Sequence, residues 1–489
     1  MAPVAEWRRL SPRMLLVHPV HELLRQVPLL LGSVVLGSAT GNPLWSIAAV
    51  VLLVAFGVAR WFTTTYRIDA EQIQRREGVL QRNLLSLPRN RIRSVSTDAR
   101  LLHRMLGLTV VKVTTGQEAK GDAEFALDAV RSDEVPRLRA ILLADSLEST
   151  DGDVPLQNRV IARWQPSWLR YSPLSFTGLA MIVAAAGIVY QTGVVAALRD
   201  SQIAREGVDA VERAGVVVAV TVAVIVVLVL SVLLSVLRSL VTFGNLVLSR
   251  RDGESVLHLQ HGLLRVRERT LDMRRLRGGT VREPLLVRAF GGARLDAVMT
   301  GVGGSGEASL LLPPCPVDTA ERVLAELIGR PDVVHGELRR HGRVATRRRW
   351  TRALTFPGLL GVALAALASL VSVPLLAWVL WAVTVPAAVF LAADRCRALG
   401  HRVGDGWLVA RAGSVERRRD CIDAAGIVGW TVRQTWFQRR AGVATLIAAT
   451  AAGVKGYRVL DVPAAQAWSV VAAASPWVAD NEWRRWTDG

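Results

Sequence analysis

Lysine is nearly absent from this basic chain. Lys and Arg together number 60 against 41 Asp and Glu, so the formal net charge is +19, yet the only lysines are Lys112, Lys120 and Lys455. Arginine therefore carries almost all of the positive charge. Two interpretations remain open, namely compositional drift in a chain rich in Ala and Val, and attraction to anionic lipid, which is worth roughly 1 kcal/mol for each basic residue near a membrane surface.

Cysteine is also scarce, and its spacing excludes two classes of small protein. The three cysteines, Cys315, Cys396 and Cys421, are far apart and form no CxxC or Cys/His pattern. Neither a disulfide framework nor a zinc site is expected, and the thiols fit a reducing compartment. The segment His18–Glu22 contains two histidines and a glutamate, but not in the order of a zinc protease motif. We therefore expect no metal and no cofactor.

Charge is missing from several long stretches, and these stretches predict membrane-spanning helices. Hydrophobic residues make up 51% of the chain, and mean hydropathy is +0.31. Apolar runs of about 17–25 residues are long enough to cross a bilayer. We expect three helix pairs, at about 24–40 and 44–62, about 173–198 and 214–240, and about 353–371 and 375–393. The first pair is short, so a re-entrant hairpin is the alternative there.

The distribution of arginine predicts how these helices are oriented. The expected turns at 41–43 and 372–374 carry no charge, whereas Arg8–Arg25 and Arg347–Arg349 are strongly basic. Basic segments stay on the cytoplasmic side of a membrane. Both termini and all large domains are therefore expected in the cytoplasm of a protein of the cell inner (cytoplasmic) membrane. No A-x-A-like site follows the first apolar run, so no cleavable leader is expected.

The segments that follow the helix pairs resemble one another, which predicts an internal repeat. Each has a Gly turn, an Arg patch and a compact turn ending in Gly107, Gly292 or Gly442, followed by an alternating strand. Each closes with an expected helix, at about 132–144, 317–329 and 463–474. The expected helix caps are Ser132-Asp133, Asp318-Thr319 and Asp461. A proline at the head of each helix pair (Pro19, Pro173 and Pro357) suggests that the pair belongs to the repeat.

The expected organisation alternates membrane segments with soluble modules. Its parts are an N-terminal segment with the first helix pair (1–63), module 1 (64–146), a linker (147–172), helix pair 2 (173–242), module 2 (243–331), a basic linker (332–352), helix pair 3 (353–394), module 3 (395–476) and a Trp-rich tail (477–489).

One family resemblance runs through this pattern. The order Tyr66–Ile68, Gly78–Leu80, Leu87–Val95 and Leu101–Gly107 resembles a bacterial pleckstrin-homology-like (PH-like) domain of the membrane-anchored kind, and the three copies are similar to the long multi-pass members of that family. The resemblance implies a multi-pass α-helical membrane protein with three α+β modules, each a small PH-like β-barrel or sandwich closed by a C-terminal helix. It also implies a smaller one-copy membrane relative as a partner. It provides no catalytic residue.

Four arginines are the candidate contacts for an anionic ligand or lipid. Arg89, Arg91 and Arg93 alternate along the chain and would share one face of a strand, where Arg82 would join them. They would bind a lipid head group or an acidic peptide, and the alternative is a solvated basic face near the membrane. The loop 301–306 lacks the Gly-Lys-Ser/Thr of a phosphate loop. No recognition helix or aromatic-basic platform indicates nucleic acid.

The sequence favours a non-enzymatic bacterial membrane scaffold. Its cytoplasmic PH-like modules would bind lipid head groups or protein partners, in envelope homeostasis or stress resistance. Expected partners are membrane lipids and either a one-copy relative or further copies of the chain. The alternative is a component of a transport or export system, which the lack of charge within the spans weakens. No nucleophile–base set points to an enzyme.

Overall fold

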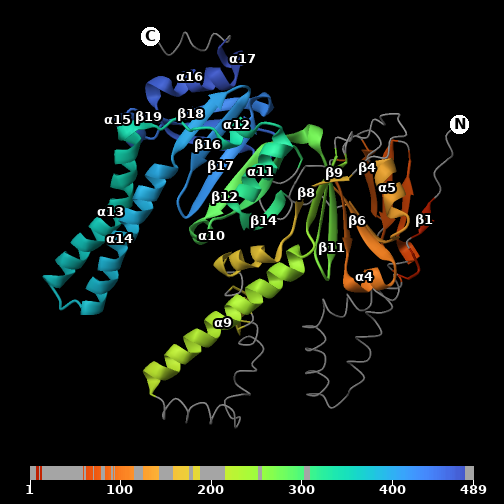
Figure 1. Cartoon of the computed structure of the whole chain (residues 1–489), viewed down its shortest axis with the longest axis horizontal. Coiled ribbons are helices and arrows are strands. Elements are labelled where there is room, and N and C mark those ends of the chain that lie inside the picture. Colours follow the sequence, from red (N-terminus) through yellow and green to blue (C-terminus); the bar gives the residue numbers. More distant parts are fainter. Residues whose placement is uncertain are drawn as a thin grey trace. The chain divides into compact units, whose positions relative to one another are not determined.

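The computed structural model describes residues 7–9, 11–13, 59, 62–69, 71–78, 83–89, 92, 94–114, 125–142, 158–175, 180–184, 186–187, 215–251, 256–301 and 309–479. Nearly all of the expected first helix pair lies outside these residues. The chain divides into two compact units, Met1–Trp164 with Leu240–Arg274, and Gln165–Ser239 with Arg275–Gly489. Figure 1 shows the elements of both.

The first unit contains two antiparallel sheets. Their strand orders are β1-β2-β3-β4 and β7-β6-β5-β11-β10-β9-β8. The strands are β1 (Arg8–Arg9), β2 (Thr65–Ile68), β3 (Gln72–Glu77), β4 (Asn83–Pro88), β5 (Ser94–Ala99), β6 (Leu108–Thr114), β7 (Phe125–Arg131), β8 (Asn158–Arg163), β9 (Val247–Arg251), β10 (Val256–His261) and β11 (Val266–Asp272). The short helix α4 (Leu101–Met105) precedes β6, and α5 (Val135–Leu142) follows β7 and packs into the core.

The second unit contains a six-stranded and a three-stranded sheet, in the orders β14-β13-β12-β17-β16-β15 and β18-β19-β20. The strands are β12 (Leu276–Pro284), β13 (Gly292–Met299), β14 (Leu310–Pro316), β15 (Gly400–Gly404), β16 (Trp407–Ala412), β17 (Glu416–Asp423), β18 (Ile427–Arg433), β19 (Val443–Thr450) and β20 (Gly456–Pro463). The helices include α10 (Leu285–Ala289), α11 (Val317–Ile328), α12 (Pro331–His335), α15 (Trp436–Arg440), α16 (Ala464–Ala474) and α17 (Pro476–Ala479).

The same order of elements occurs three times. A short helix (α4, α10 or α15) is followed by two strands and a closing helix (α5, α11 or α16). The turn after the short helix is also shared, because Gly107, Gly291 and Gly442 all have φ between 64° and 73°. Each of these glycine carbonyls accepts a backbone hydrogen bond at the start of the closing segment, from Ser132, Val317 and Ala464. Such φ values favour glycine because it has no Cβ.

Two of the expected helix caps are wrong. Helices α11 and α16 begin after Pro316 and Pro463 with no side-chain cap. In the second copy the glycine with positive φ is Gly291, and a Cβ on the next glycine, Gly292, would lie 2.5 Å from the ring of Tyr171.

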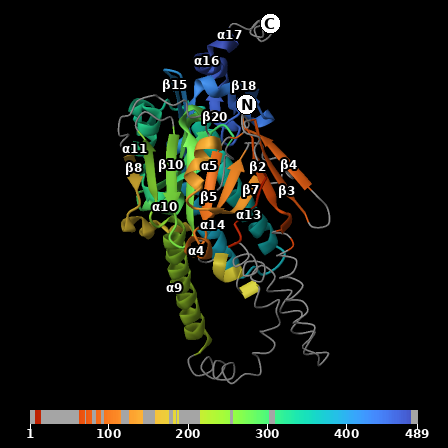
Figure 2. The ribbon, with the colours of Figure 1, turned by 90° about the vertical axis from the view of Figure 1, so that its right-hand side faces the viewer.

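Both large sheets join strands from different sequence modules. In the first unit β5 pairs with β11, and in the second unit β12 pairs with β17. Figure 2 shows β5 and β10 within one sheet. The sheets therefore cross the expected module boundaries. Each connects the second half of one copy to the first half of the next.

The register of the two inter-copy pairings is the same. Ala99 lies opposite Val266, and Glu283 lies opposite Arg417. Ala99 and Glu283 are equivalent because each stands two residues before a short helix, α4 or α10. Val266 and Arg417 are equivalent because each stands four residues after the glycine of its hairpin, Gly262 or Gly413. The inter-copy contact is thus a repeated structural unit.

Three described helices are long and apolar enough to cross a membrane. They are α9 (Val216–Phe243), α13 (Gly342–Ala368) and α14 (Leu375–Ala398). In Figure 1, α13 and α14 lead away from the sheets of the second unit as a hairpin. The helix expected to begin at about 353 in fact begins at Gly342, so Pro357 lies inside α13 rather than at its head. Of the helix expected at 173–198, residues 173–175, 180–184 and 186–187 are described. The first three form a 3₁₀ turn, and the other two segments are α-helical.

Candidate functional site

One of the four candidate arginines lies within the described residues. The guanidinium of Arg89 donates a hydrogen bond to the backbone carbonyl of Ile141, in the last turn of α5. Arg89 therefore ties the closing helix to the end of β4. Arg82, Arg91 and Arg93 lie outside the described residues, so the structure does not bring the predicted set together.

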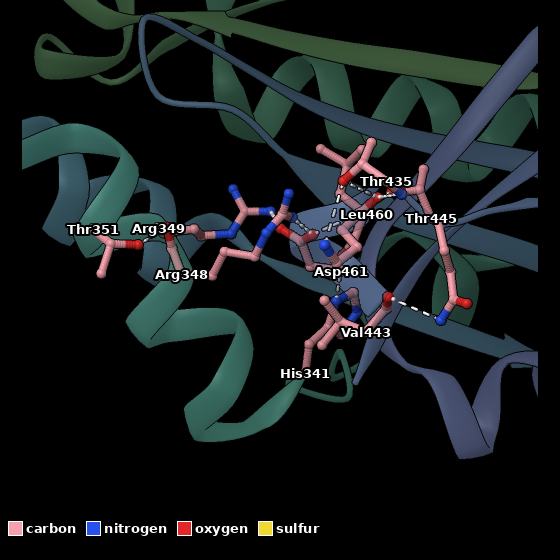
Figure 3. Close-up of polar contacts among 11 residues, drawn as sticks. His341, Arg348, Arg349, Thr351, Thr435, Val443, Thr445, Leu460 and Asp461 are labelled. Atoms are coloured by element: carbon pink, nitrogen blue, oxygen red, sulfur yellow. Dashed lines mark hydrogen bonds and ion pairs between the residues drawn. The ribbon is translucent and has the colours of Figure 1, made fainter. Parts of the chain in front are cut away.

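A cluster of buried charge instead surrounds Asp461, near the end of β20. Asp461 is buried and has φ of 55°. Its carboxylate forms ion pairs with Arg348 and, at 3.3 Å, with Arg349, both from α13. Figure 3 shows both arginine side chains reaching from the helix to Asp461. Because a buried carboxylate is costly without partners, this junction holds the start of α13 against the sheet.

The short helix α15 joins the same junction through Gln438. The side-chain amide of Gln438 donates to Asp461 at 3.0 Å and to the hydroxyl of Thr445 at 2.8 Å. Gln438 and Thr435 form a capping box at the start of α15, which satisfies two backbone donors that a helix start leaves open. Asp461 was expected to cap a helix; it connects α13, α15 and β20 instead.

A buried histidine pair lies beside this junction, also drawn in part in Figure 3. Nδ1 of His341 lies 2.7 Å from the carbonyl oxygen of Leu460, and Nε2 of His341 lies 2.7 Å from Nδ1 of His401. Burial lowers the pKa of both rings, that of His401 to about 4. A carbonyl only accepts, so neutral His341 donates through Nδ1 and accepts at Nε2 from His401. The pair thus links the residue before α13 to β15 and β20.

A second junction holds the end of α14. Asp394 accepts hydrogen bonds from Arg288 of α10 and from Arg417 of β17, both at 2.7 Å. Next to it, Arg395 donates to the hydroxyl of Ser414 at 3.2 Å. Arg411 donates to the carbonyl of Ala398 at 3.0 Å, at the last residue of the helix. Both helices of the hairpin are therefore fixed to the β-structure at their charged ends.

In the first unit, the end of α9 is held in a comparable way. The backbone N–H groups of Gly262 and Leu263 donate to the carbonyls of Gly244 and Val241, at 2.8 and 3.0 Å. Arg104 of α4 then donates to the carbonyl of Leu263 at 3.1 Å. The glycine hairpin after β10 therefore lies between the end of α9 and the short helix α4.

The same relation occurs in the second unit. The backbone N–H of Leu285, at the start of α10, donates to the carbonyl of Val415 at 2.7 Å. Val415 lies in the turn between β16 and β17. Arg395, near the end of α14, donates to the hydroxyl of Ser414 in the same turn. In both units, then, a short helix rests on the hairpin of the following copy, beside the end of an apolar helix.

All three short helices expose large apolar side chains close to arginines. The most exposed are Met105 of α4 at 77%, Phe290 directly after α10 at 64%, and Phe437 of α15 at 70%. The last of these forms an edge-to-face pair with Trp436, whose ring also lies 4.7 Å from the guanidinium of Arg440. Within the described residues, no group of three or more His, Cys, Asp or Glu side chains is arranged to hold a metal.

Sequence reasoning missed both junctions of the hairpin because their partners are distant in the chain. Arg348 and Asp461 are separated by 113 positions, and Arg288 and Asp394 by 106. Charge alone explains the run Arg347–Arg349 as a topology signal, but Arg348 and Arg349 are largely buried in ion pairs, and Arg347 is exposed. The available signal was a single acidic residue, Asp394, directly after a long uncharged run.

Comparison with known proteins supports a PH-like family for two parts of the chain. A family model described as Bacterial PH domain matches residues 24–146 and 358–472. The second match runs from within α13 to within α16, and thus includes both the apolar hairpin and the β-structure. No curated protein and no solved structure matches the chain. The middle copy lies outside the matches but has the same order of elements.

Proposed function

We propose that the chain is a non-enzymatic, multi-pass protein of the bacterial inner membrane, and that its PH-like copies form a cytoplasmic scaffold that binds lipid head groups. The observation that carries the proposal is the position of α4, α10 and α15. Each lies beside the end of an apolar helix and exposes large apolar side chains.

The α13–α14 hairpin supports a location of α10 and α15 at the membrane surface, because charged residues flank its long uncharged run. No charged residue occurs from Ala353 to Ala393, a length that allows two crossings of a hydrocarbon core about 30 Å thick. Asp394 directly follows this run, and Arg348 lies about 7 Å before it along the helix, at 1.5 Å per residue. Their partners α10 and α15 would therefore lie at the level of the lipid head groups.

The side chains on the short helices suit that level. Aromatic residues are enriched where hydrocarbon meets water, and arginines are attracted to anionic lipid. Trp436, Phe437 and Arg440 combine both features on α15. Three further arginines are exposed nearby: Arg439 in α15, and Arg347 and Arg352 in the first half of α13. Positive charge would therefore face the head groups while the aromatic rings enter the interface.

The interior of the hairpin also suits a lipid environment. The indole N–H of Trp381 donates to the carbonyl of Pro357 at 2.8 Å, which satisfies a donor that hydrocarbon would leave unpaired. A Cβ on Gly361 would lie 2.8 Å from the same indole ring. Small residues that let helices approach closely are typical of packed membrane helices.

The proposal is tested by measuring the depth of single labelled positions. The environment-sensitive dye NBD is attached to a cysteine at position 437, 290 or 105, in full-length protein reconstituted into vesicles that contain phosphatidylglycerol. Lipids brominated at known depths then quench the dye according to its position. Val362→Cys in α13 reports the hydrocarbon core, and Arg322→Cys on the exposed face of α11 reports water.

The labels at 437, 290 and 105 are expected to be quenched by bromines near the top of the acyl chains, with blue-shifted emission. The label at 362 is expected to be quenched by bromines at the bilayer centre. The label at 322 is expected to remain unquenched by bromines at either depth. An unquenched label at 362 would show that the hairpin does not span. Quenching at 362 with none at 437, 290 and 105 would reject lipid binding by the short helices.

A further inference from the structure

The first and last copies each have a strand without the neighbour that its equivalents have. β4 is the edge of its sheet, whereas its equivalents β11 and β17 pair with β5 and β12. β18 is likewise an edge, whereas its equivalents β5 and β12 pair with β11 and β17. Among the described residues, therefore, the contact that joins successive copies is present at both internal junctions and missing at the two ends of the series.

These two edges are poorly protected against pairing. β4 contains no charged residue and a single proline, Pro88, at its end. β18 contains one charged residue, Arg433, and no proline. Large apolar side chains are exposed on both, Leu84 at 57% and Val428 at 69%. An exposed apolar edge strand is a ready template for another chain, and proteins normally block such edges with charge or proline.

Other edge strands in the same molecule do carry such protection. β8 has two exposed arginines, Arg159 and Arg163. β14 contains Pro313, Pro314 and Pro316, and proline cannot donate a hydrogen bond to a neighbouring strand. The contrast indicates that β4 and β18 are edges kept available for a partner.

We propose that β18 of one chain pairs with β4 of a second copy of this chain. The pairing would be antiparallel and would continue the inter-copy contact seen between β5 and β11 and between β12 and β17. The shared register fixes which residues meet. Arg433 would lie opposite Asn83, and Thr431 opposite Leu85, as Asp98 lies opposite Arg267 and Ser96 opposite Arg269 within the chain.

Such a contact is head-to-tail, since it uses different surfaces on the two chains. Head-to-tail contacts build rings if the rotation closes and open rows if it does not. Chains in one membrane share the same orientation relative to the bilayer, which is the condition for repeating the contact. This assembly goes beyond the proposed lipid binding and does not depend on it.

The test joins two separately tagged chains by a disulfide. One full-length chain carries Asn83→Cys and the other carries Arg433→Cys; both side chains are exposed. Residues directly opposite in antiparallel strands have Cα atoms about 4.5–5.5 Å apart, within reach of a disulfide. Cys396 is replaced by Ser in both. Cys315 and Cys421 can remain, because they are buried and burial raises their thiol pKa to about 12.

Two matched controls make the result specific. In the first control, the second chain carries Val428→Cys in place of Arg433→Cys. Val428 lies at the other end of β18, about five residues or 17 Å from the position expected opposite Asn83. The double variant Thr97→Cys with Glu268→Cys, directly opposite in the described sheet, confirms that the oxidation conditions work. Both are measured in the same membranes under mild oxidation.

The expected result is a disulfide-linked dimer that carries both tags for the 83–433 pair, with at least fivefold less product for the 83–428 pair. Thr431→Lys on the second chain should reduce the 83–433 product by a similar factor, because it places a charge at the pairing edge. If the 97–268 disulfide forms and the 83–433 product does not exceed the 83–428 product, the proposed pairing is wrong.

Discussion

The two ends of the α13–α14 hairpin are fixed by ion pairs of opposite polarity. At α13 the helix provides the arginines, Arg348 and Arg349, and the β-structure provides the acid, Asp461. At α14 the helix provides the acid, Asp394, and the β-structure with α10 provides the arginines. Exchanging the two helices would place like charges together, so the reversal specifies which helix docks at which site.

The two junctions also differ in burial. Asp461 has 6% of its side chain exposed and its arginines 10–12%, whereas Asp394 has 13% and its arginines 16–20%. An unpaired charge costs more where less water reaches it. The Asp461 junction should therefore be the more sensitive of the two, and the predictions below test that order.

The largest effect is expected for Asp461→Ala. The substitution leaves Arg348 and Arg349 largely buried without their carboxylate, and removing one partner of a buried pair typically costs about 3–5 kcal/mol. Thermal or denaturant unfolding in detergent measures the loss. Asp133→Ala is the matched control, since Asp133 pairs with Arg131 in an exposed setting, where removing one partner should change stability little. Equal losses would show that burial does not decide the effect.

Asp394→Ala should cost less, about 2–3 kcal/mol, because its partners are somewhat more hydrated. The reversed pair Arg288→Asp with Asp394→Arg should recover part of the loss of either single change, as a double-mutant cycle would measure. Recovery is expected to be partial because Arg417 would then face an arginine. A double variant as unstable as the sum of the single ones would contradict direct pairing of Arg288 with Asp394.

Within the hairpin, two neighbouring glycines should respond oppositely to alanine. Gly361→Ala places a Cβ 2.8 Å from Trp381 and should destabilise the pairing of α13 with α14 by about 1–3 kcal/mol. Gly358→Ala meets no atom within 4 Å and should be neutral or stabilising by up to about 1 kcal/mol through helix propensity. Unfolding of the two variants under one set of conditions separates packing from propensity.

The last prediction is a pH dependence at the Asp461 junction, which is small near neutral pH and grows as pH falls. The folded pKa of both His341 and His401 lies below the ordinary value of 6.5, that of His401 at about 4. Below pH 6.5 the unfolded chain binds more protons, so stability should fall as pH decreases from 6.5 toward 4 and should not change above 6.5 through these groups. The loss from His401 at pH 5.5 is about 1 kcal/mol.

His401→Gln should flatten this part of the stability curve, which unfolding measured between pH 4.5 and 7.5 would show. His335→Gln, at an exposed histidine, is measured under the same conditions as the matched control. An unchanged slope in His401→Gln would exclude the buried ring as its source.

Hydropathy identified the three apolar helices that the structure describes, but not all of their limits. The uncharged run from 353 to 393 predicted the hairpin, yet α13 begins at Gly342, because Arg348 and Arg349 are neutralised by a residue that local sequence does not reveal. Alternation likewise predicted strands such as β19. It did not predict that β12 pairs with β17 of the next copy, because alternation specifies the faces of a strand and not its neighbour.

The depth of position 437 in a lipid bilayer tests the central claim most directly, because α15 is attached to the hairpin through Asp461 and carries Phe437 at its surface. Depth-resolved quenching should place this position at the boundary between head groups and acyl chains, with position 362 near the bilayer centre. A label at 437 that remains in water, while 362 is deep in the bilayer, would contradict the account.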